Sequence, residues 1–387
     1  MLIYILFLVF FIVSYGLLHY YVGIRLWQCL LSCQTYISAK LYWLLFWVLA
    51  FAYLFARIGQ RRLPVSIKNF FTQLGSYWMA IFIILFACFV VLDIIRLLLY
   101  FFGHRLTLTA GGPFWGAVVL LVASVLFIVG TWNVYKPAVT TYELTIAKTG
   151  GQIKELNAVL VSDLHLGGIN TRRFLSKMTE RINKLNPDVV LIAGDIIEEE
   201  AAQAVKHDYA GIFRQLHAVY GVYAVPGNHE YYGGEAEDIL NYLEQGGIKV
   251  LRDSYSYVAD SFYIVGRDDP GRHYGNNNST RNQLSEIMEG IERNKLIILL
   301  NHQPIELDEA VEQGVDLQLS GHTHRGQIFP ASLITARIFE KDWGHIQKGD
   351  YHLIVTSGYG VWGPPLRIGS RAEIVQIKIK FADNTGY

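Results

Sequence analysis

The N-terminal third of the chain is a succession of long apolar stretches with few interruptions. Four of them approach or exceed the roughly 20 apolar residues that cross the hydrocarbon core of a bilayer as a helix. They are Leu2–Val22, Leu41–Ala56, Tyr77–Phe102 and Pro113–Trp132. The first stretch lacks the basic start and the small-residue cleavage pattern of a secretory signal, and three more apolar stretches follow it. Residues 1–135 are therefore predicted to form a transmembrane region of four helices.

Beyond residue 135 the pattern changes to short β-branched runs that alternate with amphipathic stretches. We expect residues 136–156 to be a linker that contains a first strand, Thr141–Ile146. Further strands are predicted at Ala158–Ser162, Asp188–Ala193, Gly221–Val225, Phe262–Val265, Leu296–Leu300, Leu317–Ser320, Leu353–Thr356 and Ala372–Phe381. Helices are predicted at Arg172–Leu185, Ala201–Ala218 and Glu235–Gly246. This strand–helix–strand order predicts a layered α/β catalytic domain over residues 157–387.

Charge divides the chain at the same point. The 387 residues carry 33 basic and 33 acidic side chains, but residues 1–135 hold only eight of the basic ones and one of the acidic ones. The first part therefore has a net charge of +7 and the rest a net charge of −7. So few charges exclude an ordinary soluble domain in the first part. All three cysteines lie in or beside the apolar stretches, so the C-terminal part has neither a disulfide framework nor a thiolate metal site.

The distribution of Lys and Arg predicts the orientation of the chain in the membrane. The loop between the second and third spans is expected to carry Arg57, Arg61, Arg62 and Lys68. The loops on the opposite face are expected to carry Arg25, Lys40 and Arg105. Loops rich in basic residues stay in the cytoplasm. With four spans, the basic loop shares a side with both chain ends, so the C-terminal domain is predicted to be cytoplasmic.

Asp93 is the one acidic residue inside a predicted span. An acidic group at membrane depth is energetically unfavourable and often functional, which leaves a channel or transporter with an attached enzyme as an alternative function. Arg96 follows three residues later on the same helical face. We therefore favour an ion pair between Asp93 and Arg96.

Side chains that bind metals follow five of the predicted strands, each time at the carboxyl end of the strand. They are Asp163, His165, Asp195, Asn228, His229, His302, His322 and His324. In open α/β sheets the carboxyl ends of parallel strands border one crevice. We therefore expect these side chains, which come from distant parts of the sequence, to meet. Glycines at 194, 227 and 321 allow tight turns directly before three of these positions.

The donor types predict which ions the cluster binds. Leaving His229 aside, two Asp, one Asn and four His side chains offer oxygen and imidazole ligands without sulfur, a set that suits Mn, Fe, Zn or similar divalent ions. Seven ligands are too many for one ion but suffice for two ions that share a carboxylate and a water. Two such ions hold the phosphate oxygens and lower the pKa of the shared water. The sequence therefore predicts a dinuclear centre in which a metal-bridging hydroxide attacks phosphorus.

The motifs that carry these residues resemble those of the calcineurin-like metallophosphoesterase superfamily, in particular its membrane-associated bacterial branch. They are Asp163-x-His165, Gly194-Asp195, Gly227-Asn228-His229-Glu230, Asn301-His302 and Gly321-His322-Thr323-His324. The similarity covers roughly residues 156–380, and segments 357–363 and 371–374 resemble the closing part of that branch. The resemblance implies a four-layered fold, with two facing β-sheets flanked by helices, here preceded by the four-helix transmembrane region.

The resemblance also assigns roles to single residues. It implies a first metal site of Asp163, His165, Asp195 and His324, and a second of Asp195, Asn228, His302 and His322, with Asp195 as the bridge. His229 resembles the histidine that gives a proton to the leaving group, oriented by Asp163, so both residues are catalytic candidates. A histidine paired with a carboxylate suits that task near neutral pH.

Two positions depart from the pattern of the family. Glu230 stands where many relatives have Asp, a difference that we expect to matter little. Arg325 replaces a glycine that is common after the His-Thr-His motif. Arg325 is either a bystander, which we weight slightly higher, or a cation that reaches the substrate phosphate. Asn228 and Arg325 are therefore the candidate substrate-binding residues.

These features define an expected function. The chain is predicted to be a membrane-anchored, metal-dependent phosphohydrolase: a phosphomonoesterase, a phosphodiesterase or a pyrophosphatase. The short linker keeps the site near the bilayer, so we expect a lipid or lipid-linked phosphate as substrate, membrane lipids as partners and no nucleic acid. The alternative is a catalytically silent membrane sensor or scaffold with the same fold, which the complete set of ligands disfavours.

Overall fold

The computed structural model describes residues 2–32, 38–59, 62–103, 113–232, 234–271 and 281–381. The chain forms two compact units, one of residues 1–132 with 363–366 and one of residues 133–362 with 367–387. Arg61 and Arg105, which enter the predicted membrane orientation, lie outside the described residues.

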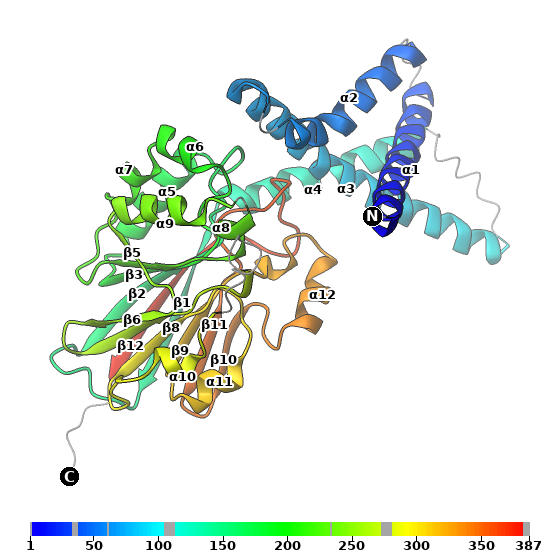
Figure 1. Cartoon of the computed structure of the whole chain (residues 1–387). Coiled ribbons are helices and arrows are strands. Elements are labelled where there is room, and N and C mark those ends of the chain that lie inside the picture. The colour runs from blue at the N-terminus through cyan, green and yellow to red at the C-terminus, as the bar shows by residue number, and fades with distance from the viewer. Residues whose placement is uncertain are drawn as a thin grey trace. The chain divides into compact units, whose positions relative to one another are not determined.

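The N-terminal unit is built from long apolar helices. They are α1 (Leu2–Ser32), α2 (Ala39–Ile58), α3 (Val65–Phe101) and α4 (Pro113–Tyr135) (Figure 1). Each is long and apolar enough to cross a membrane, so the four predicted spans are confirmed as helices. The prediction ended the first helix ten residues early and began the third one twelve residues late, because polar residues near the helix ends were read as loop.

Four of the basic residues expected in loops lie inside helices instead: Arg25 in α1, Lys40 and Arg57 in α2, and Lys68 in α3. Arg25 contacts the acidic residue of the third span. Its Nη2 lies 2.6 Å from Oδ2 of Asp93 in α3. The expected pair with Arg96 is also present, with 3.2 Å between Nη1 and Oδ1, and the Tyr21 hydroxyl donates to Asp93 at 2.7 Å. Asp93 therefore links α1 to α3. The transporter alternative had Asp93 as its sole support, and the ion pairs give this residue a structural role instead.

The second unit contains two six-stranded sheets. The first sheet has the order β1-β12-β2-β3-β4-β5. Its strands are β1 (Ala138–Ile146), β2 (Glu155–Val161), β3 (Val189–Ala193), β4 (Val222–Val225), β5 (Ile248–Val250) and β12 (Glu373–Phe381). The second sheet has the order β10-β11-β9-β8-β7-β6. Its strands are β6 (Ser254–Val258), β7 (Phe262–Gly266), β8 (Leu296–Leu300), β9 (Leu317–Ser320), β10 (Gly344–Lys348) and β11 (Tyr351–Val355).

Strands β2, β3, β4 and β5 run parallel to one another, as do β7, β8, β9 and β11. Parallel strands end at the same edge of a sheet, which is the arrangement that the strand-terminal ligands require. Strand β1 begins three residues after the end of α4 and pairs along its full length with β12. Most of the expected linker is therefore part of the first sheet, and the predicted strand Thr141–Ile146 lies within β1.

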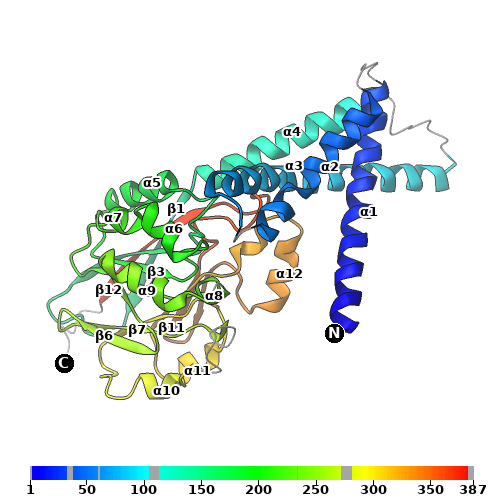
Figure 2. The ribbon, with the colours of Figure 1, turned by 45° about the horizontal axis from the view of Figure 1, so that its top comes forward.

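Three apolar layers hold the second unit together. One lies between the two sheets and contains Leu160, Leu191, Ile298 and Leu319. The helices α5 (Arg172–Asn183), α6 (Ala201–Lys206), α7 (Tyr209–Phe213) and α9 (Ala236–Gln245) cover the outer face of the first sheet (Figure 2). The helices α10 (Leu284–Ile287) and α11 (Leu307–Glu312) cover the outer face of the second. This four-layered arrangement confirms the predicted fold class.

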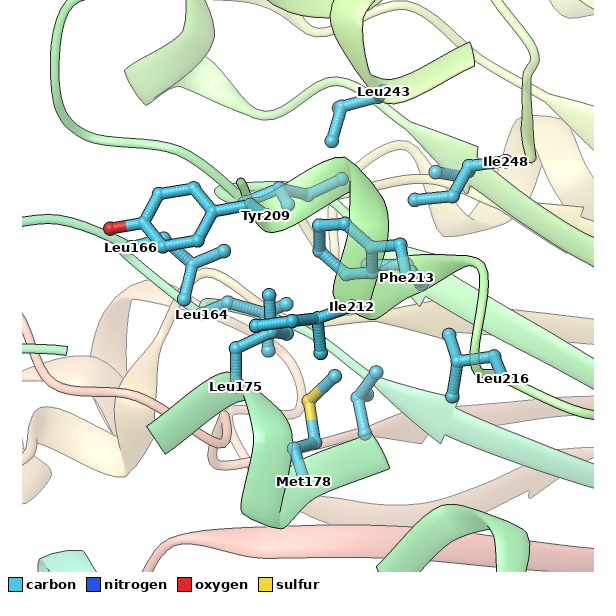
Figure 3. Close-up of a cluster of buried hydrophobic side chains, with 14 of the residues drawn as sticks. Leu164, Leu166, Leu175, Met178, Tyr209, Ile212, Phe213, Leu216, Leu243 and Ile248 are labelled. Carbon is cyan, nitrogen blue, oxygen red and sulfur yellow. The ribbon is translucent and has the colours of Figure 1, made fainter. Parts of the chain in front are cut away.

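The alternation of strand residues produces these layers. In β8, Leu296, Ile298 and Leu300 belong to the layer between the sheets, whereas Ile297 and Leu299 pack toward α10 and α11. On the other side of the unit, Leu175 and Met178 of α5 and Ile212 and Phe213 of α7 belong to one buried hydrophobic cluster (Figure 3). Since burying such a side chain contributes about 1.5–3 kcal/mol, these layers are sufficient to hold the strand ends in fixed positions.

Some elements differ from the prediction. The helix expected over Ala201–Ala218 is divided into α6 and α7, because Asp208 adopts a left-handed conformation (φ +51°) and caps α7 through Gly211. Strands β5, β6 and β10 were not predicted. Three short helical segments lie near the strand ends: α8 (Asn228–Tyr232), the 3-10 turn His324–Gly326 and α12 (Ala331–Ile338).

Close packing of α2 against α3 yields a prediction for the N-terminal unit. A Cβ at Gly75 would collide with the backbone nitrogen of Tyr53, whereas a Cβ at Gly16 would meet no atom within 4 Å. Membrane helices approach closely where small residues face each other. We expect Gly75→Leu to lower the apparent melting temperature of the detergent-solubilised protein, since overpacking a well-packed contact costs about 1–3 kcal/mol. Gly16→Leu is the control, and equal melting temperatures for the two variants would contradict the packing of α2 on α3.

Candidate metal centre

The predicted ligands lie at the carboxyl ends of strands from both sheets. Asp163 and His165 follow β2, Asp195 follows β3 and Asn228 follows β4, all in the first sheet. His302 follows β8, and His322 and His324 follow β9, in the second sheet. Hydrogen bonds join the two edges: the His322 amide donates to the Asp163 carboxylate at 3.0 Å, and His302 Nδ1 lies 2.7 Å from the Ala193 carbonyl oxygen. The structure therefore brings residues up to 161 positions apart, Asp163 and His324, into one cluster.

One group of ligand atoms comes from Asp163, His165 and His324. The Nε2 atoms of His165 and His324 are 3.1 Å apart. His324 Nε2 is also 3.4 Å from Asp163 Oδ1. All three side chains are buried.

A second group comes from Asp195, His302 and His322. His322 Nδ1 lies 3.3 Å from His302 Nε2. Asp195 Oδ2 is 3.3 Å from His302 Nε2 and 3.8 Å from His165 Nε2. The carboxylate of Asp195 therefore lies between the two groups, at the position that the family resemblance assigns to the bridging ligand.

The residues fit the divalent metal ions that the sequence predicts. Two ligand atoms that each lie about 2.1 Å from one ion, at right angles, are about 3.0 Å apart, close to the nitrogen separations in both groups. Asn228 Nδ2 donates to the Tyr232 hydroxyl at 2.9 Å, while its Oδ1 is buried without a hydrogen-bond partner among the described residues. Buried polar atoms are rarely left unpaired, and an amide oxygen is a suitable ligand for such ions.

Burial sets the protonation of the histidines. It lowers the pKa of His165 and of His322 to about 4, and it lowers that of His324 well below its ordinary value. These imidazoles are therefore neutral at neutral pH, and neutral imidazole is the form that binds metals. His302 differs: burial would lower its pKa, but the Asp195 carboxylate raises it well above the ordinary value. Its Nδ1 donates to the Ala193 carbonyl, and its Nε2 faces Asp195 and His322. A backbone acceptor of this kind fixes the tautomer of a metal-binding histidine.

The backbone at the centre is strained. Asp163, His165, Asp195, His322, His324 and Arg325 all have φ between +44° and +69°. Left-handed conformations of residues other than glycine are uncommon, cost on the order of 1–3 kcal/mol each, and concentrate at functional sites. This clustering is independent of the sequence motifs and points to the same residues.

His229 lies at the surface of the cluster. Its amide donates to Asp195 Oδ1 at 3.0 Å, and its ring centre is 4.6 Å from that of His165. The rings of Tyr232 and Trp362, which are more than half exposed, lie 5.0 and 6.3 Å away. The expected partner Asp163 instead contacts Ser162, the His322 amide and His324. Among the described residues, His229 is therefore positioned by the hydrogen bond from its amide to Asp195 and by the neighbouring rings.

Glu230 has a larger role than the sequence suggested. Its buried carboxylate accepts hydrogen bonds from four backbone amides, those of Asp195, Ile196, Ile197 and Gly227, at 2.7–3.1 Å. Burial raises the pKa of Glu230 to about 7. The residue fixes the loop after β3 to the turn before Asn228, so it positions ligands of both groups without belonging to either.

Two arginines lie beside His324. Arg325 places its guanidinium 4.0 Å from the centre of the Trp343 ring, a cation–π contact. Arg367, which lies outside the sequence motifs, is fully buried. Its Nη2 donates to the carbonyl oxygens of Ser357, Gly358 and Gly360 and lies 3.3 Å from His324 Nδ1. Arg367 therefore holds the loop after β11 against the centre.

The chain is similar over most of its length to proteins that are named for one family. A family model described as calcineurin-like phosphoesterase matches residues 156–326. A Danio rerio protein named "Transmembrane protein with metallophosphoesterase domain" is 30% identical over 81% of this chain and 76% of its own length. An "Uncharacterized metallophosphoesterase" of Aquifex aeolicus is 35% identical over 63% of this chain and 91% of its own length. Among solved structures, a dimetal phosphatase from Danio rerio matches 59% of this chain and 99% of its own, with 12% identity and a TM-score of 0.36.

Close backbone packing at the centre gives a second prediction. A Cβ at Gly321 would collide with Ser162 Oγ and with the Asp163 carboxylate, whereas a Cβ at Gly167 would meet its nearest neighbour at 3.7 Å. We expect Gly321→Ala to displace Asp163 and to reduce the amount of bound Mn²⁺, measured by elemental analysis after equilibration and desalting. Gly167→Ala is the matched control. Wild-type metal content in Gly321→Ala would contradict a role for Asp163 as a ligand.

Proposed function

Because this chain belongs to the calcineurin-like metallophosphoesterases, we propose that it is a membrane-anchored phosphohydrolase whose two divalent ions serve the hydrolysis of a phosphoester or pyrophosphate. The convergence of six donor side chains from four strand ends of two sheets is the observation that carries this proposal. We assign Asp163, His165, Asp195 and His324 to one ion. We assign Asp195, Asn228, His302 and His322 to the other ion. When bound, such a pair of ions neutralises phosphate oxygens and makes the water between them acidic.

The residues of the chain supply positioning and proton transfer. Asp195 offers Oδ2 to histidines of both groups, while its Oδ1 is occupied by the His229 amide. This division keeps the orientation of the carboxylate fixed. His229 is half-buried and borders the cluster, so its imidazole is available to give a proton to a departing alkoxide.

Asn228 and Arg325 are the proposed contacts to the substrate. Asn228 is next to His229, and its Oδ1 has no protein partner among the described atoms. Arg325 directly follows His324, and the Trp343 ring restricts its guanidinium. An arginine that is already oriented loses less conformational entropy when it binds a phosphate. We therefore now favour phosphate binding by Arg325 over a bystander role.

The helices of the N-terminal unit support the membrane anchor. All four are long and apolar enough to span a bilayer, and the relative from Danio rerio is named a transmembrane protein. Arg57 in the last turn of α2, Lys68 in the first turn of α3, and Arg62 all lie at or beside the connection between these helices, whereas Arg25 lies inside α1, so we still propose a cytoplasmic catalytic domain. Because β1 begins three residues after α4, we propose a lipid or lipid-linked phosphate as the substrate. We propose no nucleic-acid partner.

A catalytically silent sensor on the same fold is the second candidate. Such a sensor, unlike an enzyme, does not need a complete metal centre. Every predicted ligand is present in this chain, and six of the seven lie in the ligand groups described above. The enzyme is therefore the better proposal.

The proposal predicts metal-dependent hydrolysis that depends on Asp195. We expect the full-length protein with Mn²⁺ to hydrolyse at least one member of a panel of p-nitrophenyl phosphate, bis-p-nitrophenyl phosphate, nucleotides, phosphatidic acid and isoprenyl pyrophosphate. Asp195→Ala removes the shared ligand and is expected to abolish turnover and the rise in melting temperature on adding Mn²⁺. A wild-type protein that binds Mn²⁺ but turns over no substrate would favour the sensor. Preference for nucleotides over the lipid phosphates would contradict the proposed lipid substrate but not the proposed hydrolysis.

The proposed role of His229 can be tested separately through the leaving group. We expect His229→Ala to lower turnover of substrates with alkoxide leaving groups by about 10²–10⁴-fold, the usual contribution of a general acid. The p-nitrophenolate anion is stable without a proton, so the loss should be much smaller with p-nitrophenyl substrates. Equal losses for both classes, measured with unchanged metal content, would exclude proton donation by His229.

A further inference from the structure

The helix α12 exposes its apolar side and packs with its polar side. None of its eight residues is buried. At 100° per residue, Leu333, Ile334 and Ile338 lie within an arc of about 140°, and these side chains are 59%, 60% and 68% exposed. Thr335 lies on the opposite side, where its hydroxyl donates to Asp342 at 2.7 Å. A surface helix of a soluble domain normally has the reverse arrangement.

Phe329, directly before α12, extends this apolar surface and is 57% exposed. We define the α12 face as Phe329, Leu333, Ile334 and Ile338. A contiguous group of large exposed apolar side chains marks a surface that is covered in use. Arg337, which is exposed, lies within the same arc as the apolar residues. An apolar stripe with a cation beside it is typical of helices that lie in the interface of a bilayer.

Hydrogen bonds connect the α12 face to the chain that leaves the fourth apolar helix. Asn133, in the last turn of α4, donates from Nδ2 to the Arg367 carbonyl at 3.2 Å. The next residue, Ile368, donates from its amide to Gln327 and accepts from the amide of Phe329, at 3.0 and 2.8 Å. The α12 face is therefore separated by only a few residues from the point where the chain emerges from its last membrane-spanning helix.

We propose that the α12 face docks on the lipid bilayer and holds the catalytic domain against the membrane. The connection through Asn133 selects the bilayer as the occupant, because it keeps this face close to the surface from which α4 emerges. Arg337 matches the negative charge of the cytoplasmic leaflet. His324 lies seven positions before α12 in the sequence, so docking there would orient the metal centre toward phosphates at the membrane surface. The docking itself does not depend on the hydrolytic chemistry.

The test is the environment of a label at Ile338 in the full-length protein. Cys29, Cys33 and Cys88 are first replaced by alanine, and Ile338→Cys is labelled with the environment-sensitive fluorophore NBD. The protein is reconstituted in phosphatidylcholine–phosphatidylglycerol vesicles. Val219→Cys is the matched control, because Val219 is an exposed apolar residue of the same unit (78%) and is remote from α12 in sequence. Both variants must elute as folded protein in size-exclusion chromatography and bind Mn²⁺ as the cysteine-free parent does.

We expect the label at position 338 to emit at shorter wavelength in vesicles and to be quenched by doxyl groups on the lipid chains. The label at position 219 should show neither effect. Water-like emission at position 338 would overturn the proposal. It would also be overturned if the shielding of position 338 disappeared on dilution of the protein with empty lipid, because a second copy would then cover the face. Neither readout uses catalysis, so an inactive protein would leave the result interpretable.

Discussion

The carboxylate of Asp195 is the constraint on which the candidate centre depends. It is buried where the edges of two sheets meet, and its two oxygens have different partners: Oδ1 accepts the His229 amide, and Oδ2 faces His165 and His302. Burial alone would disfavour the charged form, but the positive charge of His302 lowers the pKa of Asp195 well below its ordinary value. A charge in such a place is stable only if cations surround it. The same geometry that stabilises the carboxylate therefore creates a site for divalent ions.

Bringing so many donors together requires backbone that ordinary residues avoid. Gly194 has φ +82°, and a Cβ there would approach His302 Nδ1 to 2.5 Å. The ligands themselves occupy left-handed conformations, and their strain is offset by the apolar layers on both sides of each sheet and by the four amides that Glu230 binds. The free energy of these contacts therefore offsets the backbone strain at the strand ends, where the residues of the family motifs lie.

The sequence predicted which side chains cluster better than it predicted the residues that support the cluster. Asp163, Asp195 and His302 could be found because each follows an apolar strand directly, which is a local signal. The role of Glu230 could not, because its partners lie more than thirty residues away at Asp195 and Ile196. The pair of Arg25 and Asp93 was missed for the same reason. Strand β10 was missed because it lies at the edge of its sheet, where polar residues such as Gln347 face solvent and leave no apolar run.

Arg367 shows why the fold needs the segment beyond the last predicted ligand. Three carbonyl oxygens of the loop after β11 converge on its Nη2, and a buried cation is the donor best suited to bind several carbonyls at once. That loop includes Gly358, where a Cβ would approach the Asp163 Cβ to 2.8 Å. The backbone carbonyl of Arg367 accepts from Asn133 at the end of α4. Arg367 thus connects the loop packed against Asp163 to the end of the fourth apolar helix. The end of that helix and the geometry of the centre therefore depend on the same residue.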